Sequence, residues 1–147
     1  MDIDKIFEMW KEDCQINTKD LESDIINTSK KHAKYLEMLS VSRLVSKRTE
    51  QKYKTLMKDK WLWYNGKMSK DEMDERGWSY TPLNGLKVLK SDLDKFYDSD
   101  PDVQELACKV EYAKTRVSVL EEIVTNLKWR HQTIKNILES RKLEIGM

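Results

Sequence analysis

The feature that most constrains this chain is a hydrophobic repeat of three and then four residues that runs from Val103 to Ile145. With Val103 at position a, eleven of the thirteen a and d positions are apolar. A repeat of 3.5 residues places one narrow apolar stripe on a helix, and that stripe must be buried against another helix. The partner helix can belong to the same chain, as in an antiparallel bundle, or to another subunit. The seam residues that we expect to take part in oligomer assembly are Val103, Leu106, Val110, Ala113, Val117, Leu120, Val124, Leu127, His131, Ile134 and Leu138.

The start of this helix is well marked in the sequence. Asp100 can cap the free backbone amides, and Pro101 suits the first helical position because its φ is already helical. Asp102 then complements the positive end of the helix dipole, whereas Arg141 suits the negative end. The pattern predicts a long terminal helix from about residue 101.

The composition favours long helices over a compact α/β enzyme. Of 147 residues, 36% are charged and 39% are hydrophobic, with only four Gly and two Pro. Cys14 and Cys108 lack metal-ligand spacing and are expected to be reduced thiols. The first ten residues carry acids where a signal peptide needs bases, and no apolar run approaches a membrane span. We therefore expect an all-α, soluble protein of the cytoplasm that has no contact with membranes.

A coarse reading divides the chain into two regions. Residues 1–85 form an N-terminal helical region, with a helix over about 3–12 and a long one from about 21 to 64 that Asn27 to Ser29 can interrupt. Residues 65–85 hold three of the four glycines and are predicted to be a loop. Residues 86–147 form a C-terminal oligomerisation region with a short helix before the long one. The expected architecture is an elongated helical hairpin or bundle.

Positive charge is concentrated in one segment. Residues 43–67 hold 8 basic and 2 acidic side chains, a net charge of +6, although the whole chain carries only +1. Such a concentration is typical of polyanion binding.

Within this segment, basic side chains alternate with aromatic rings. Lysines can neutralise phosphates and flat rings can stack on unpaired bases, so the pattern is typical of a single-strand binder. Alternatively, Tyr53, Met57, Trp61 and Tyr64 form an ordinary core stripe. Trp63 argues against the core stripe because it lies about 200° around the helix from Trp61. The predicted DNA-binding residues are Lys47, Arg48, Lys52, Lys54, Lys58, Lys60, Trp61, Trp63, Tyr64 and Lys67.

The run from Lys58 to Lys67 resembles the basic-x-basic, aromatic, small-Gly-basic segment of the UvsY family, recombination mediator proteins of T-even-type bacteriophages. Further along, the segment 99–103 is similar to the one that opens the family's last helix. Arg130 followed by Ile134 and Lys135 also matches, as does the ending that contains Arg141, Glu144 and Gly146. The chain departs from the family pattern at Asp59, Trp61 and Trp63, where the family has a small neutral residue, Leu and Asp.

The resemblance implies a small helical protein that assembles into a ring of six or seven subunits in the infected host cell. It implies binding to single-stranded DNA, and it implies the recombinase and the single-strand-binding protein as partners. It assigns DNA contact to Lys58 and Lys60 and oligomer assembly to the C-terminal helix. Val at a with Leu at d favours two-stranded coils, so the seam does not fix the subunit number.

The residues do not predict an enzyme, a cofactor or a metal site. The sequence around Asn65 to Lys67 lacks the second glycine and the hydroxyl residue of a phosphate-binding loop. His32 and His131 have no nucleophile or metal ligands beside them. The acidic run from Asp71 to Glu75 is interpreted as a solvated loop, with metal binding, DNA mimicry or contact with a basic partner as alternatives.

The basic-aromatic segment favours binding to single-stranded DNA, and the resemblance to the UvsY family implies a recombination mediator that promotes loading of a recombinase onto strands coated with single-strand-binding protein. The first alternative is a structural coiled-coil adaptor whose basic segment binds an acidic partner. The second is an architectural protein that binds duplex DNA, which is disfavoured because stacking rings are of little use against closed base pairs.

Overall fold

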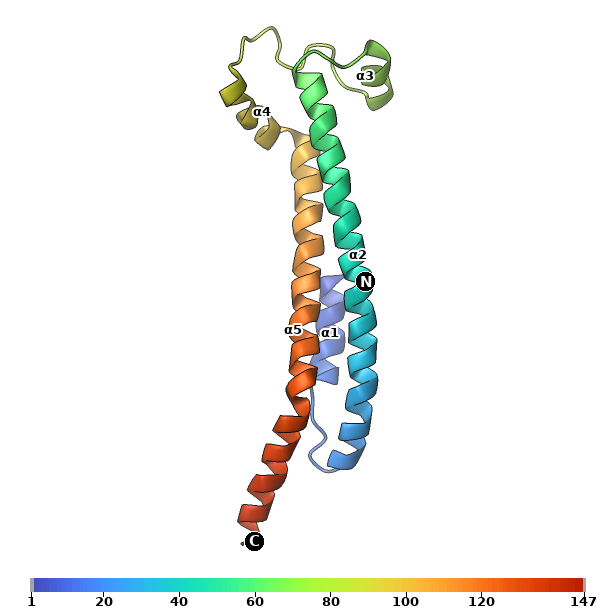
Figure 1. Ribbon diagram of the computed structural model, residues 1–147, viewed down its shortest axis with the longest axis vertical. Coiled ribbons are helices and arrows are strands. Elements are labelled where there is room, and N and C mark those ends of the chain that lie inside the picture. Colours follow the sequence, from blue (N-terminus) through green and yellow to red (C-terminus); the bar gives the residue numbers. More distant parts are fainter. Residues whose placement is uncertain (1, 147) are drawn as a thin grey trace. The chain divides into compact units, whose positions relative to one another are not determined.

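A computed structural model describes residues 2–146, and every regular element in that range is helical (Figure 1). The prediction of an all-α fold with a long C-terminal helix is confirmed. Its elements, in chain order, are α1 (Ile3–Asp13), α2 (Leu21–Tyr64), α3 (Lys70–Arg76), a 3₁₀ turn (Lys90–Asp92), α4 (Leu93–Ser99) and α5 (Pro101–Glu144). None of the helices described is both long and apolar enough to cross a membrane.

The helix ends follow the capping chemistry of the sequence. The Asp100 carboxylate accepts hydrogen bonds from the Asp102 amide at 2.9 Å and the Val103 amide at 3.3 Å, so it caps α5 as predicted. At the start of α2, the Asp20 carboxylate accepts a hydrogen bond from the Ser23 amide at 3.0 Å and caps the helix. At its end, Gly66 adopts φ 68°, which a glycine tolerates without steric cost.

Three expectations about elements are wrong. The polar residues Asn27 to Ser29 do not interrupt α2, because the Thr28 hydroxyl turns back to the Asp24 carbonyl at 2.8 Å and the helix continues. The predicted loop 65–85 contains α3, whose Ser69 cap accepts from the Glu72 amide at 3.3 Å. The short helix expected from residue 86 begins only at Leu93, after the 3₁₀ turn.

The chain forms two compact units. The first, which we call the core unit, contains the chain up to Val45 and from Ala113 on. The second, which we call the basic unit, is Ser46–Tyr112. The long helices α2 and α5 each contribute to both units.

In the core unit, α1 packs beside α2 and α5 (Figure 1). Its hydrophobic centre consists of Ile6, Tyr35, Leu39, Leu120, Ile123, Val124 and Leu127, all nearly inaccessible to solvent. The Tyr35 hydroxyl donates to the Asp13 carboxylate at 2.7 Å, and the buried Arg130 guanidinium donates to the Asp13 carbonyl at 3.0 Å. These two bonds fix the end of α1, since they satisfy carbonyl and carboxylate groups that would otherwise be left unpaired.

The heptad seam is used largely inside one chain. Leu120, Val124 and Leu127 are at most 4% exposed and belong to the core cluster with residues of α1 and α2. The seam becomes accessible towards its end, where His131 is exposed and Leu138 is 41% exposed. The chain itself therefore covers the central seam residues. Their role in oligomer assembly remains a prediction.

Candidate nucleic-acid interface

One face of α2 in the basic unit carries exposed lysines that lead to a tryptophan. At 3.6 residues per turn, Lys47, Lys54, Lys58 and Trp61 fall within an arc of about 60°. All four side chains are exposed, and that of Lys58 is 68% accessible. We call these four residues the lysine face. It combines charges that can neutralise phosphates with a ring that can stack on a base.

Lys60 lies on the opposite side of the helix, about 200° from Lys58. Its side chain is only 2% accessible, and its ammonium is 2.8 Å from Asp102 and 3.0 Å from Asp100. The same ammonium lies 3.8 Å from the centre of the Trp78 ring and 4.4 Å from that of Trp63. We call these five side chains the Lys60 cage. In this structure the Lys60 charge is neutralised within the chain, so the ammonium does not face a strand bound on the lysine face.

The Lys60 cage joins three segments of the basic unit. Asp100 caps α5, Trp78 follows α3, and Lys60 is in α2. Burial alone would raise the pKa of the Asp100 carboxyl, but hydrogen bonds from Tyr64 at 2.7 Å and from Lys60, together with the Val103 amide, outweigh burial and hold this pKa below its usual value. Asp100 is therefore ionised at neutral pH, and the buried lysine keeps its counter-charge.

Two predicted DNA-binding aromatics take part in internal contacts. Trp63 donates its indole N–H to the Ser79 carbonyl at 2.7 Å and stacks obliquely on Trp78 at 5.1 Å between ring centres. Tyr64 packs edge-on against Tyr97 at 5.4 Å, and burial raises its pKa, as does its bond to Asp100. Both residues are only partly exposed, whereas Trp61 is 43% exposed. Trp61 is therefore the predicted aromatic residue best placed to meet a base.

A cavity of about 370 Å³ opens beside Trp61. The residues that line it, which we call the Trp61 pocket, are Trp61, Asn65, Lys67, Lys90, Leu93, Asp94 and Tyr97. The Lys67 ammonium lies 4.5 Å from the centre of the Trp61 ring. Lys90, Asp94 and Tyr97 come from the 3₁₀ turn and α4, and they were not among the predicted site residues. Only the fold brings them to Trp61, because more than 25 residues separate them in the chain.

A wider and shallower groove of about 470 Å³ carries the remaining predicted cations, Arg48 and Lys52, together with Arg76. Gln51, Thr55, Leu56 and Asp59 complete its lining. Arg76 pairs with Asp59 at 2.9 Å and lies over the Trp78 ring at 5.0 Å. Sequence reasoning missed Arg76, although a basic residue next to a glycine at a helix end is a recognisable signal. The Asp59 carboxylate, which interrupts the basic run, is thus neutralised by Arg76.

The acidic run 71–75 lies within α3. Asp71 and Glu72 lie in the first turn of α3, where they complement the helix dipole. Asp74 accepts a hydrogen bond from the Tyr80 hydroxyl. Within residues 2–146 no group of three or more potential ligands is close enough to hold a metal ion.

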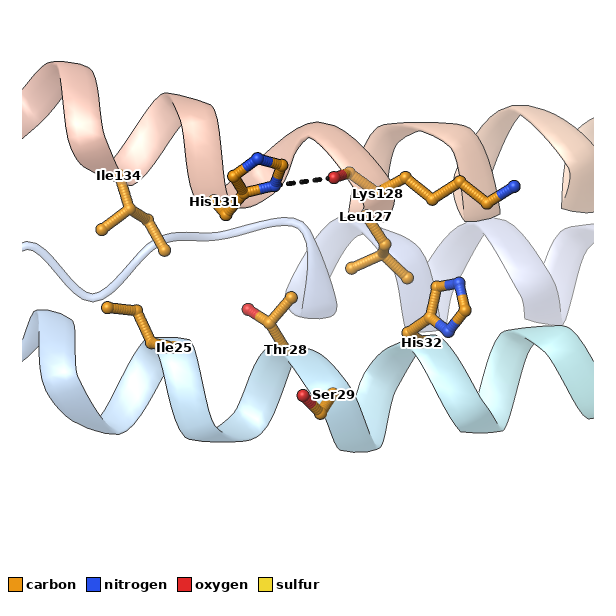
Figure 2. Close-up of a pocket in the computed structure, with 8 residues that line it drawn as sticks. All are labelled: Ile25, Thr28, Ser29, His32, Leu127, Lys128, His131 and Ile134. Carbon is orange, nitrogen blue, oxygen red and sulfur yellow. Dashed lines mark hydrogen bonds between the residues drawn. The ribbon is translucent and has the colours of Figure 1, made fainter.

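A second cavity of about 370 Å³ belongs to the core unit and contains both histidines (Figure 2). Its lining comes from α2 and α5 and consists of Ile25, Thr28, Ser29, His32, Leu127, Lys128, His131 and Ile134. The His131 Nδ1 atom lies 2.9 Å from the Lys128 carbonyl, which ties the ring to its own helix. With one lysine and no Trp, Tyr or Phe ring, this cavity has less to offer a nucleic acid than the lysine face.

Comparisons with known proteins agree with the fold and with the family suggested by the basic segment. The sequence profile described as "Recombination, repair and ssDNA binding protein UvsY" matches residues 9–147. Among solved structures, the crystal structure of the recombination mediator protein UvsY of bacteriophage T4 is similar, with a TM-score of 0.83 and 22% identity over 99% of this chain and 98% of that chain. A search of curated proteins finds no match.

Proposed function

This chain belongs to the UvsY family of recombination, repair and single-stranded-DNA-binding proteins, and on that premise we propose that it loads a recombinase onto single-stranded DNA coated with single-strand-binding protein. The observation that carries the proposal is the lysine face, where three exposed lysines and an exposed tryptophan share one side of α2. A sequence-tolerant single-strand binder needs cations along the backbone and rings for stacking.

The lysine face has the dimensions of a short strand contact. Lys47 and Lys58 are eleven residues apart, which corresponds to about 16 Å along a helix. We infer that the three lysines meet successive phosphates of an extended strand while Trp61 meets a base. Arg48 and Lys52, in the shallower groove, extend the positive field beyond this line.

Lys60 has a different part in this proposal. Its ammonium is enclosed by the carboxylates of Asp100 and Asp102 and by two indole rings. We infer that Lys60 positions the end of α2 against the start of α5, so that its loss weakens DNA binding indirectly. The DNA contact that the family resemblance implies for this residue would require the Lys60 cage to open.

Assembly is the second half of the proposal. Each subunit offers only a few phosphate contacts, and joining several subunits turns weak contacts into avidity. The exposed apolar residues near the end of α5, Leu138, Leu143 and Ile145, are available for contact with another subunit. The proposal also includes a ring of six or seven subunits and a strand that is strained by wrapping on it. This strain releases the single-strand-binding protein and allows recruitment of the recombinase.

One titration tests the DNA-binding step. Trp fluorescence is followed while single-stranded DNA, duplex DNA or heparin is added to wild type and to Trp61→Phe. The expected result is several-fold tighter binding of the single strand, with quenching that is reduced in Trp61→Phe. Equal affinity for all three polyanions without quenching would contradict the proposal and favour the adaptor that binds an acidic protein.

A further inference from the structure

We propose that the Trp61 pocket holds one unpaired nucleobase of the bound strand and prefers bases that carry an exocyclic amino group over thymine. This inference rests on the proposed single-strand binding and specifies the ligand of that site. It is carried by the cavity beside Trp61 and by the polar groups of α4 that line it.

The pocket offers a stacking surface and is large enough for one base. Its volume of about 370 Å³ lies at the small end of ligand-binding cavities. Trp61 is 43% exposed, and the Lys67 ammonium lies 4.5 Å from the centre of its ring. A base that stacks on Trp61 can replace this ammonium, since a base offers a larger apolar surface to the ring than an exposed ammonium does. Lys67 is then free to pair with a phosphate of the same nucleotide.

Tyr97 forms the inner wall of the pocket. It is only 8% exposed, and no residue among 2–146 meets its buried hydroxyl with the geometry of a hydrogen bond. The nearby Asn65 side chain opposes the effect of burial on the Tyr97 pKa. Burial without a full hydrogen bond is costly for a hydroxyl, so we infer that a base entering the pocket shifts Asn65 aside and takes its place beside the Tyr97 hydroxyl.

Asp94 gives the pocket its expected selectivity. A carboxylate only accepts hydrogen bonds, and amino groups of adenine, cytosine and guanine donate them, as in Asp and Glu contacts to cytosine N4. Thymine has no exocyclic amino group. Lys67 and Lys90 line the same cavity and offset the repulsion between Asp94 and the phosphates. Closed base pairs cannot enter a cavity of this kind, because the base must leave its stack to do so.

The test compares three oligonucleotides of equal length, oligo-dC, oligo-dT and a fully abasic strand, by fluorescence anisotropy of a terminal dye. Wild type is expected to bind oligo-dC several-fold tighter than oligo-dT, and the abasic strand most weakly. Asp94→Ala is expected to remove the preference for dC over dT. The matched control is Asp98→Ala, because Asp98 lies on the same helix with the same charge but outside the pocket.

A second variant, Tyr97→Phe, removes only the buried hydroxyl. It is expected to lower the affinity for oligo-dC several-fold while the unfolding temperature of the free protein stays the same or rises, because the substitution removes a buried hydroxyl that has no full hydrogen bond. Equal binding of all three strands, or the same effect from Asp94→Ala and Asp98→Ala, would contradict the proposed binding of a base in the Trp61 pocket and leave the proposed function intact. Failure to bind any of the three would overturn the proposed function and the pocket together.

Discussion

At the scale of single residues, Lys58 and Lys60 carry the same charge two positions apart but lie in opposite environments. The Lys58 side chain is 68% accessible, whereas that of Lys60 is 2% accessible and pairs with two carboxylates. Lys60→Met leaves the buried Asp100 without its cation, and breaking a buried pair in this way costs about 3 kcal/mol. Lys58→Met is expected to change the free energy of unfolding by less than about 0.5 kcal/mol. Urea unfolding of the two variants measures the difference.

These two variants also separate structure from DNA contact. Lys58→Met is expected to weaken DNA binding with no loss of stability. If Lys60→Met were as stable as wild type, the Lys60 cage would not have the role assigned here. Lys60→Arg keeps the charge, so it is expected to recover part of the stability that Lys60→Met loses.

Asp100 predicts a pH dependence of stability. Because the folded state holds its pKa below the usual value, Asp100 stabilises the fold above the unfolded pKa of about 3.9, and this contribution is lost as the pH falls through the folded pKa. Asp100→Asn is expected to cost about 2 to 3 kcal/mol at pH 7, since it replaces hydrogen bonds to a charged acceptor. The difference in the free energy of unfolding between wild type and Asp100→Asn should narrow below about pH 4. A difference that stays constant from pH 7 to pH 3 would contradict the assignment.

At the scale of helices, the sequence predicts those features whose causes are local. The Asp100 cap and the end of α2 near Gly66 depend only on capping residues beside each helix end. The helix α3 was missed although Ser69 and Glu72 have the spacing of a capping box. The glycines around it had suggested a loop, but Gly77 is only the left-handed residue that ends α3.

The candidate site shows the limit of reasoning from the sequence. The different environments of Lys58 and Lys60 could have been predicted from the sequence, since residues two positions apart lie on opposite sides of a helix. The partners of Lys60 could not have been predicted in this way, because Asp100 and Asp102 are 40 or more residues away and only the fold brings them to α2. The same holds for Lys90 and Asp94 beside Trp61.

The same substitution is expected to have different effects at two positions of the α5 seam. Leu120 is fully buried in the core unit, so Leu120→Ala is expected to cost about 2 to 5 kcal/mol of stability. Leu138 has the same side chain at 41% exposure, and Leu138→Ala is expected to leave the fold stable while weakening assembly. Thermal unfolding and sedimentation equilibrium measure the two effects. Equal loss of stability in both variants would contradict this division of the seam.

At the scale of the whole molecule, affinity and assembly are linked through avidity. If each subunit neutralises about three phosphates through Lys47, Lys54 and Lys58, the slope of log affinity against log salt is about −2 for each engaged subunit. Replacing these three lysines by Ala is expected to remove most of that slope without changing the oligomer. Lys87→Ala, an exposed lysine of the same unit outside the lysine face, is the matched control and should change the slope little.

The final prediction concerns mediation itself, which requires both the lysine face and the assembly. Recombinase-dependent ATP hydrolysis is followed on strands coated with single-strand-binding protein. Wild type is expected to shorten the lag before hydrolysis. The triple lysine variant should fail to stimulate hydrolysis because it cannot hold the strand. Leu138→Asp should keep weak, salt-sensitive DNA contact but also fail to stimulate. A buried carboxylate at a subunit interface opposes assembly, so the contacts of separate subunits no longer add. A monomeric Leu138→Asp that mediates as well as wild type would show that avidity is not needed. If wild type gives no stimulation with its cognate recombinase although it binds single-stranded DNA, the adaptor takes the place of the mediator.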